Sequence, residues 1–186
     1  MRIITGTARG AKLRAPKGMT TRPTADRIKE SLFNILGRTV EDKKVLDVFA
    51  GTGNLGLEAL SRGADSAVFI DKATADIIIF NAEHTHLSDR AEVLRGDALH
   101  CLSQLELRGC KFDLVFCDPP YRMGLWERVL SKFDNSNLLN NGAVIIVEHG
   151  TDENDFPRLN SLVVSRNEKY GRTTQLTFLV KQDGSD

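Results

Sequence analysis

A glycine-rich loop stands between a predicted strand and a predicted helix. Residues 51–56, Gly-Thr-Gly-Asn-Leu-Gly, match G-x-G-x-x-G directly after the apolar run 45–50, and Asp71 follows Gly51 by 20 residues. Glycines there let the backbone turn sharply toward a ligand, and a carboxylate at the end of the second strand can accept both hydroxyls of a ribose. The pattern predicts a site for a nucleotide-type cofactor; the alternative is a purely structural turn.

Two further acids bear on the kind of cofactor. Asp47 lies four residues before Gly51, at a strand end, where its charge would repel a pyrophosphate but attract a cationic amino-acid group. Asp97 ends the third predicted strand, where a carboxylate can meet the exocyclic amine of adenine. The alternative for Asp97 is that it only caps the helix that follows. Acids in these places favour a sulfonium cofactor with an ammonium group over a dinucleotide.

The sequence Asp118-Pro119-Pro120-Tyr121 ends the fourth predicted strand, at the edge where such sheets bind ligands. The two prolines remove N–H donors and leave carbonyl acceptors. Asp118 adds a carboxylate acceptor, and Tyr121 adds an aromatic face. Together they suit a planar base whose –NH2 group donates to Asp118 and to the Pro119 carbonyl; the alternative is a rigid turn. Glu148 ends the fifth predicted strand and could approach the site, but its residue type alone assigns it no role.

Apolar runs and glycines predict the elements that position these groups. Strands are expected at 45–50, 67–71, 91–97, 112–118 and 142–149, with helices at 55–62, 74–87 and 98–107. This alternation, with nearly continuous apolar strands, predicts a doubly wound, mostly parallel α/β sheet. The segments 161–171 and 174–181 leave no room for a helix between them, so they predict a closing antiparallel hairpin and seven strands in all.

The N-terminal segment, residues 1–38, carries a charge that the whole composition hides. The chain has 186 residues, 25 basic and 25 acidic, but nine basic and two acidic residues lie in 1–38. Its formal charge is therefore +7, and that of residues 39–186 is −7. We predict a short strand pair in this extension, then a helix from about Asp26 to Leu36 with Thr24 as its N-cap. A basic extension suits contact with a nucleic-acid backbone.

Other classes of protein are not expected. Cys101, Cys110 and Cys117 form no C-x-x-C pair, and His84 and His86 would face different sides of a helix, so we expect no metal site. No run approaches the roughly 18 apolar residues of a membrane span, and the first residues lack the apolar core of a signal peptide. We therefore expect a cytoplasmic protein without membrane contact, and a monomer.

Taken together, the motifs resemble those of the amino-methyltransferases that use S-adenosylmethionine. FAGTG after VLDV, acids at the ends of strands two and three, and DPPY after strand four carry this resemblance. The segments RIITGTARGAKL, TRPTADRIKESLFNIL and LDVFAGTGNLGLEALSRGA, with the late YGRT, resemble one family over nearly the whole chain: the bacterial small-subunit ribosomal RNA guanine-N2 methyltransferases of the RsmD type. The resemblance implies a Rossmann-like methyltransferase fold.

The resemblance also implies a reaction and a substrate. A methyl group would pass from S-adenosylmethionine to the N2 amine of a guanine in small-subunit ribosomal RNA. The small size of the basic extension suggests limited recognition of RNA on its own, so we expect the RNA to be part of an assembled particle. An adenine-N6 methyltransferase acting on DNA or RNA is the main alternative, because DPPY also occurs in such enzymes. Methyltransferases for protein amides or small molecules, a nicotinamide dehydrogenase and a non-catalytic RNA-binding module are the others.

Residue roles follow from the resemblance and from the basic extension. The residues expected around the cofactor are Thr24, Asp47, Phe49, Gly51, Gly53, Asp71, Lys72, Asp97 and Ala98. The residues expected to hold the target base and support catalysis are Asp118, Pro119, Pro120 and Tyr121. The residues expected to contact RNA are Arg9, Lys12, Arg14, Arg22 and Arg27. The chain would divide into an RNA-contacting, cofactor-covering extension, residues 1–38, and a methyltransferase domain, residues 39–186.

Overall fold

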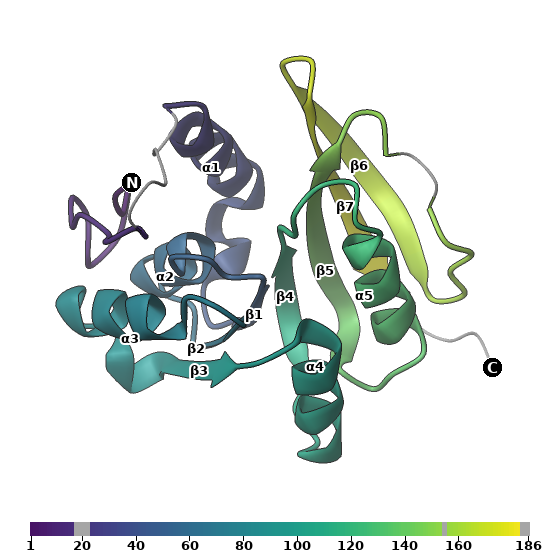
Figure 1. Ribbon diagram of the computed structural model, residues 1–186, viewed down its shortest axis with the longest axis horizontal. Coiled ribbons are helices and arrows are strands. Elements are labelled where there is room, and N and C mark those ends of the chain that lie inside the picture. The colour runs from purple at the N-terminus through teal and green to yellow at the C-terminus, as the bar shows by residue number, and fades with distance from the viewer. Residues whose placement is uncertain (17–22, 154–155, 183–186) are drawn as a thin grey trace.

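A mixed seven-stranded sheet forms the centre of the computed structural model, which describes residues 1–16, 23–153 and 156–182, with residues 23–25 described by backbone alone (Figure 1). The strand order is β3-β2-β1-β4-β5-β7-β6. The bounds are β1 (Lys44–Val48), β2 (Ser66–Asp71), β3 (Ala91–Arg95), β4 (Phe112–Cys117), β5 (Leu139–Gly150), β6 (Leu162–Tyr170) and β7 (Thr174–Lys181). Strands β1 to β5 pair in parallel, and β7 is antiparallel to β5 and β6. The predicted mostly parallel sheet with a closing hairpin is confirmed.

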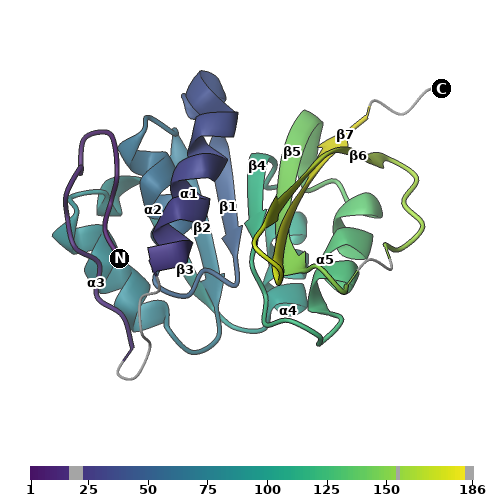
Figure 2. The same ribbon diagram turned by 90° about the horizontal axis from the view of Figure 1, so that it is seen from above.

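Helices cover both faces of the sheet. One face carries α1 (Pro23–Leu36), α2 (Asn54–Ser61) and α3 (Ala75–His84), and the other carries α4 (Ala98–Leu107) and α5 (Leu125–Asp134) (Figure 2). Short 3-10 helices, η1 (Gly37–Val40) and η2 (Ser88–Arg90), precede β1 and β3. Helix α5 was not predicted as an element, although it buries four apolar residues, among them Trp126 and Phe133. Within the described ranges, no helix has the length and apolar character needed to cross a membrane.

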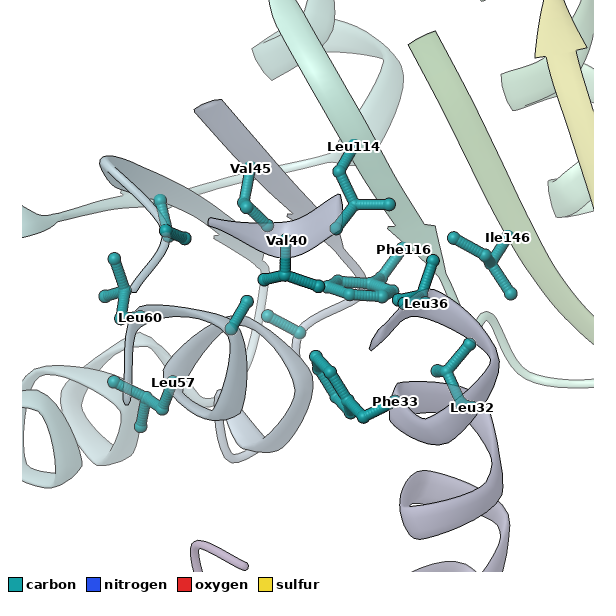
Figure 3. Packing of buried hydrophobic residues seen from close by; sticks show 14 of the residues in the cluster. Leu32, Phe33, Leu36, Val40, Val45, Leu57, Leu60, Leu114, Phe116 and Ile146 are labelled. Atoms are coloured by element: carbon teal, nitrogen blue, oxygen red, sulfur yellow. The ribbon is translucent and has the colours of Figure 1, made fainter. Parts of the chain in front are cut away.

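Helix α1 belongs to the same hydrophobic core as the sheet. Its buried residues Leu32, Phe33 and Leu36 face β4 and β5 (Figure 3). The rings of Phe33 and Phe116 lie 5.7 Å apart at an angle of 54°. Because aromatic pairs in this tilted arrangement contribute beyond their buried area, α1 is held firmly against the strands. The division of the chain after residue 38 stays a prediction.

The predicted strand pair in the N-terminal extension is present but shorter than predicted. The two segments run antiparallel, with one bridge between Arg2 and Lys12 and backbone hydrogen bonds that join Ile3 to Ala11 and Leu13 to Met1, at 2.9 and 3.1 Å. The backbone N–H groups of Ile4 and Thr5 donate to the Glu58 carboxylate on α2, at 2.8 and 3.0 Å. A two-stranded hairpin is marginal in water, and these hydrogen bonds to a buried acid anchor it to α2.

The predicted start of the first helix is wrong. Helix α1 begins at Pro23, so Thr24 is its second residue and cannot be the N-cap. Proline suits the first helical position because its missing N–H would have no helical partner there and its φ angle is already helical. Arg22 lies outside the described residues. Other bounds shift by up to about three residues, as expected for helix and strand ends.

A buried ionic cluster joins α1 and α2 to the first residues of the chain. Lys29 Nζ donates to the Arg2 carbonyl at 2.6 Å and to Asn54 Oδ1 at 2.7 Å, and it lies 3.1 Å from Glu58 Oε2. Arg62 Nε donates to Glu58 Oε1 at 2.8 Å. Burial lowers the pKa of Lys29, and the charge of Glu58 acts against that shift. The cluster fixes the N-terminal segment beside the loop that follows β1.

Candidate active site

The glycine-rich loop takes a backbone course that only a few residue types accept. Gly51 and Gly53 have φ angles of 57° and 78°, and Phe49 has the unusual value of 62° for a non-glycine residue. A Cβ on Gly56 would lie 2.3 Å from Phe69 Cε1, so glycine lets α2 pack closely on β2. The loop therefore turns at the end of β1 and directs the start of α2 toward the same edge of the sheet.

Asp71 organises this loop from the end of β2. Its Oδ2 accepts from the Gly51 N–H at 2.9 Å, and its Oδ1 accepts from the N–H groups of Ala73 and Thr74 at 2.8 and 2.9 Å. Burial acts to raise the pKa of Asp71, but the backbone donors outweigh it and hold the pKa below its ordinary value. Asp71 is thus charged and oriented, with lone pairs left for hydroxyl donors. Lys72, beside it, is exposed.

Asp97 is the N-cap of α4. Its Oδ1 accepts from the N–H groups of Leu99 and His100 at 3.0 and 3.2 Å. The capping role that the sequence left open is therefore confirmed. Its second oxygen has no hydrogen-bond partner within the part of the chain that the structure describes. Asp97 is exposed, so this second carboxylate oxygen is an acceptor at the surface after β3. Ala98, the next residue, is buried.

A cavity of about 250 Å³ opens at the carboxyl ends of β1, β4 and β5. Strand order reverses between β1 and β4, which is where doubly wound sheets bind ligands. Three carboxylates, those of Asp47, Asp118 and Glu148, line it. Of the residues predicted around the cofactor, Phe49 and Gly51 line it too. The predicted residues outside the cavity lining, all within the described ranges, are Gly53, Asp71, Lys72, Asp97, Ala98, Pro119, Pro120 and Tyr121.

Asp47 is the most deeply buried of the three carboxylates. Its residue is 2% exposed, and its Oδ2 accepts from the Gly56 N–H at 2.9 Å. Burial raises the pKa of Asp47 to about 8; the Gly56 hydrogen bond acts against this shift and the charge of Asp71 adds to it. A buried acid with this pKa is suited to a cationic ligand group, which would favour its charged form.

Replacing Asp47 with asparagine is expected to stabilise the free protein and to weaken binding of a cationic ligand. The folded protein keeps a proton on Asp47 up to about pH 8, whereas the unfolded chain releases it above about pH 4. Ionisation therefore favours the unfolded chain between these pH values, and the free energy of unfolding of the wild type falls as the pH rises. Asparagine cannot ionise and can still accept from Gly56. The free energy of unfolding of D47N should exceed that of the wild type by a margin that grows by up to about 1.4 kcal/mol per pH unit. Chemical denaturation at pH 5, 6, 7 and 8 measures the margin; one that is constant with pH contradicts the expectation.

Asp118, Tyr121 and Glu148 come together across two neighbouring strands. The β4–β5 register pairs Cys117 with Val147, so Asp118 and Glu148 are each one residue further on. Tyr121 Oη donates to Glu148 Oε1 at 2.8 Å. The residue Asp118 is exposed, but desolvation of its carboxyl group by the surrounding protein raises its pKa well above its ordinary value, and the charges of Glu148 and Asp47 add to the shift.

Glu148 is the site residue to which the sequence assigned no role. Burial also raises its pKa, and the hydrogen bond from Tyr121 acts against that shift. Its position at the end of the fifth strand was the sequence signal that it could approach the site. The register of β5 with β4, which places it beside Asp118, could not be read from the sequence.

The predicted RNA-contacting residues lie on the surface of the extension. Arg9, Lys12, Arg14 and Arg27 are exposed. The Arg14 guanidinium stacks 3.5 Å from the centre of the Phe80 ring, which limits its freedom. These positions leave the basic side chains available to a polyanion without placing them in the cavity.

Comparisons with known proteins agree with this arrangement. The family described as Conserved hypothetical protein 95 matches residues 1–179. Ribosomal RNA small subunit methyltransferase D of Escherichia coli (strain K12) is 41% identical over 159 residues, which is 84% of this chain and 78% of that protein. YlbH of Bacillus subtilis is 37% identical over 175 residues, 93% of this chain and 95% of YlbH. The solved structure of yhhF from Escherichia coli has a TM-score of 0.85 and 36% identity, with 98% of each chain covered. The chain therefore belongs to the family of the ribosomal RNA small subunit methyltransferases D.

Proposed function

We propose that the protein transfers a methyl group from S-adenosylmethionine to the exocyclic N2 amine of a guanine in small-subunit ribosomal RNA. The observation that carries the proposal is the cavity in which Asp118 of the DPPY sequence meets Asp47 and the glycine-rich loop. The relatives named ribosomal RNA small subunit methyltransferase D supply the substrate class. We further propose that the enzyme acts in the cytoplasm as a monomer, on RNA within an assembled small-subunit particle.

The residues around the loop fit S-adenosylmethionine. Asp47 is a buried acid that lines the cavity and would pair with the ammonium group, next to the backbone of Phe49, Gly51 and Gly53. Asp71 and Lys72 would hold the ribose. Asp97 and Ala98 would frame the adenine, because the Asp97 oxygen not used by the cap can accept from its amine. Thr24, near the start of α1, would cover the cofactor from the N-terminal side.

The chain's own part in the reaction is to orient the amine. When bound, S-adenosylmethionine supplies an electrophilic methyl group on a sulfonium leaving group. The Asp118 carboxylate and the Pro119 carbonyl would each accept one N–H of the base amine, which favours a nitrogen whose lone pair points at the methyl carbon. Pro120 fixes the turn, and Tyr121 stacks on the base. Charge-assisted hydrogen bonds of this kind contribute roughly 1.5–3 kcal/mol each, and the extra proton leaves the methylated amine to water.

Methyl transfer to defined RNA substrates tests the proposal. Purified protein is incubated with radiolabelled S-adenosylmethionine and unmethylated small-subunit particles, naked ribosomal RNA or DNA, and the modified nucleoside is then identified. We expect N2-methylguanosine, formed fastest on the particle. N6-methyladenosine as the product, or transfer to DNA alone, would establish the adenine-N6 alternative instead.

Reversing the charge of Arg9, Lys12 and Arg14 to glutamate is expected to weaken RNA binding. Each phosphate that a basic side chain neutralises contributes through counterion release. The slope of log affinity against log salt should therefore fall by about 2 to 3. A matched control reverses three exposed basic residues elsewhere, Lys44, Lys111 and Arg128, and should leave the slope unchanged. Equal slopes for the two triple variants would show that the extension does not contact the RNA backbone.

A further inference from the structure

Glu148 brings a second carboxylate to the place where the target base would lie. It stands on β5, one residue past the pair that Val147 forms with Cys117 on β4, and Asp118 stands one residue past Cys117. Both acids line the same cavity. Glu148 lies outside the DPPY sequence. The groups that would face the base therefore include a residue that the motif does not contain.

The hydrogen bonds of Glu148 leave it with an acceptor to spare. Its Oε1 accepts from Tyr121 Oη at 2.8 Å, and the same hydroxyl lies 3.2 Å from Thr174 Oγ1. The Oε2 atom of Glu148 and both carboxylate oxygens of Asp118 have no hydrogen-bond partner among the residues described. Asp118 and Glu148 thus place two neighbouring hydrogen-bond acceptors in the cavity. A ligand with two neighbouring donors would be complementary to them.

The two purines differ in this respect. Guanine carries an N1–H beside its N2 amine, so its edge offers adjacent donors, whereas adenine carries an unprotonated N1 beside its N6 amine. We propose that Glu148 is the specificity residue that accepts the N1–H of the target guanine while Asp118 accepts from its N2 amine. This inference rests on the proposed function and deepens it, because it explains how a DPPY site selects guanine over adenine.

The electrostatics of the two acids bear on this role. Glu148 is half-buried and Asp118 is exposed, and desolvation raises the pKa values of both, with the charge of Glu148 adding to the shift at Asp118. Two N–H donors from one base would offset the loss of hydration and the repulsion together. An acceptor at N1 would instead require Glu148 to keep a proton, because an ionised carboxylate has no donor to offer it, and an acceptor left unpaired in the complex costs about 1–3 kcal/mol.

The test compares two target bases that share the reacting amine. Small-subunit RNA is assembled with guanine or 2-aminopurine at the modified position; both bases carry the 2-amine, but 2-aminopurine has no N1–H. Wild-type kcat/KM should favour guanine by about 10- to 100-fold. In E148Q, the amide can accept from Tyr121 and turn its NH2 group to the base, so the preference should vanish or reverse.

Y121F is the matched control, because it removes the hydroxyl that Glu148 accepts from and keeps the carboxylate. It should lower kcat/KM for both bases by the same factor and keep the preference for guanine. If E148Q also slows both bases equally, or if the wild type shows no preference, Glu148 only positions Tyr121 and the inference is overturned. A wild-type enzyme that does not methylate guanine at all would overturn the proposed function, and this inference with it.

Discussion

Replacing Asp118 with alanine is expected to reduce methyl transfer by at least about 100-fold while affinity for S-adenosylhomocysteine changes little. The carboxylate would hold the amine in the geometry of attack, so the variant loses a charge-assisted hydrogen bond and the positioning that depends on it. Within the described residues, Asp118 makes no side-chain hydrogen bond, and the residue is exposed. Removing it should therefore leave the fold intact.

Two measurements separate the roles at this position. Calorimetry with S-adenosylhomocysteine reports cofactor binding, and single-turnover transfer to the particle reports chemistry. D118N, which keeps the shape of the side chain but lacks the charge, should lie between the wild type and D118A in rate. A loss of cofactor affinity as large as the loss of rate would instead place Asp118 in the cofactor site.

Replacing Glu58 with alanine is expected to destabilise the protein by about 3–5 kcal/mol. The fully buried carboxylate accepts from the N–H groups of Ile4 and Thr5 and pairs with Lys29 and Arg62. The variant would leave the Lys29 ammonium buried without its counter-charge, and two backbone donors without an acceptor. Urea denaturation measures the loss. Because the N-terminal segment is anchored there, E58A should also be cut faster by protease within the first 16 residues.

The control for this prediction is E58Q. Glutamine keeps an acceptor oxygen for the backbone but lacks the charge for Lys29, so it should lose roughly half as much stability. If E58A unfolds at the same urea concentration as the wild type, the ionic cluster does not hold the extension.

The site was predictable where the groups that define it are local in sequence. The glycine-rich loop, the acid at the end of β2 and the DPPY turn each follow a strand directly, and a parallel sheet brings such positions to one edge. The capping role of Asp97 was predictable, because the residue stands directly between a strand and a helix; its contact with the adenine stays a proposal.

The remaining features depend on pairings between distant segments. Glu148 enters the site through the register of β4 with β5. The N-terminal strand pair was predicted, but its anchor was not, because Ile4 and Thr5 donate to Glu58, more than 50 residues away. Lys29 counted only as one more basic residue, yet it lies between Ile28 and Leu32 on the buried side of α1. Its position in the apolar pattern was the signal for a buried charge.

The lining of the cavity has a consequence for how the protein matures. Met1 and Leu176 line the same cavity, together with residues of α1, β1, β4 and β5. A ribosome synthesises the first of these residues long before the last, and contacts so distant in sequence form late in folding. A chain that lacks β7 would lack part of this lining. We therefore expect the cavity to be complete only after β7 has paired with β5.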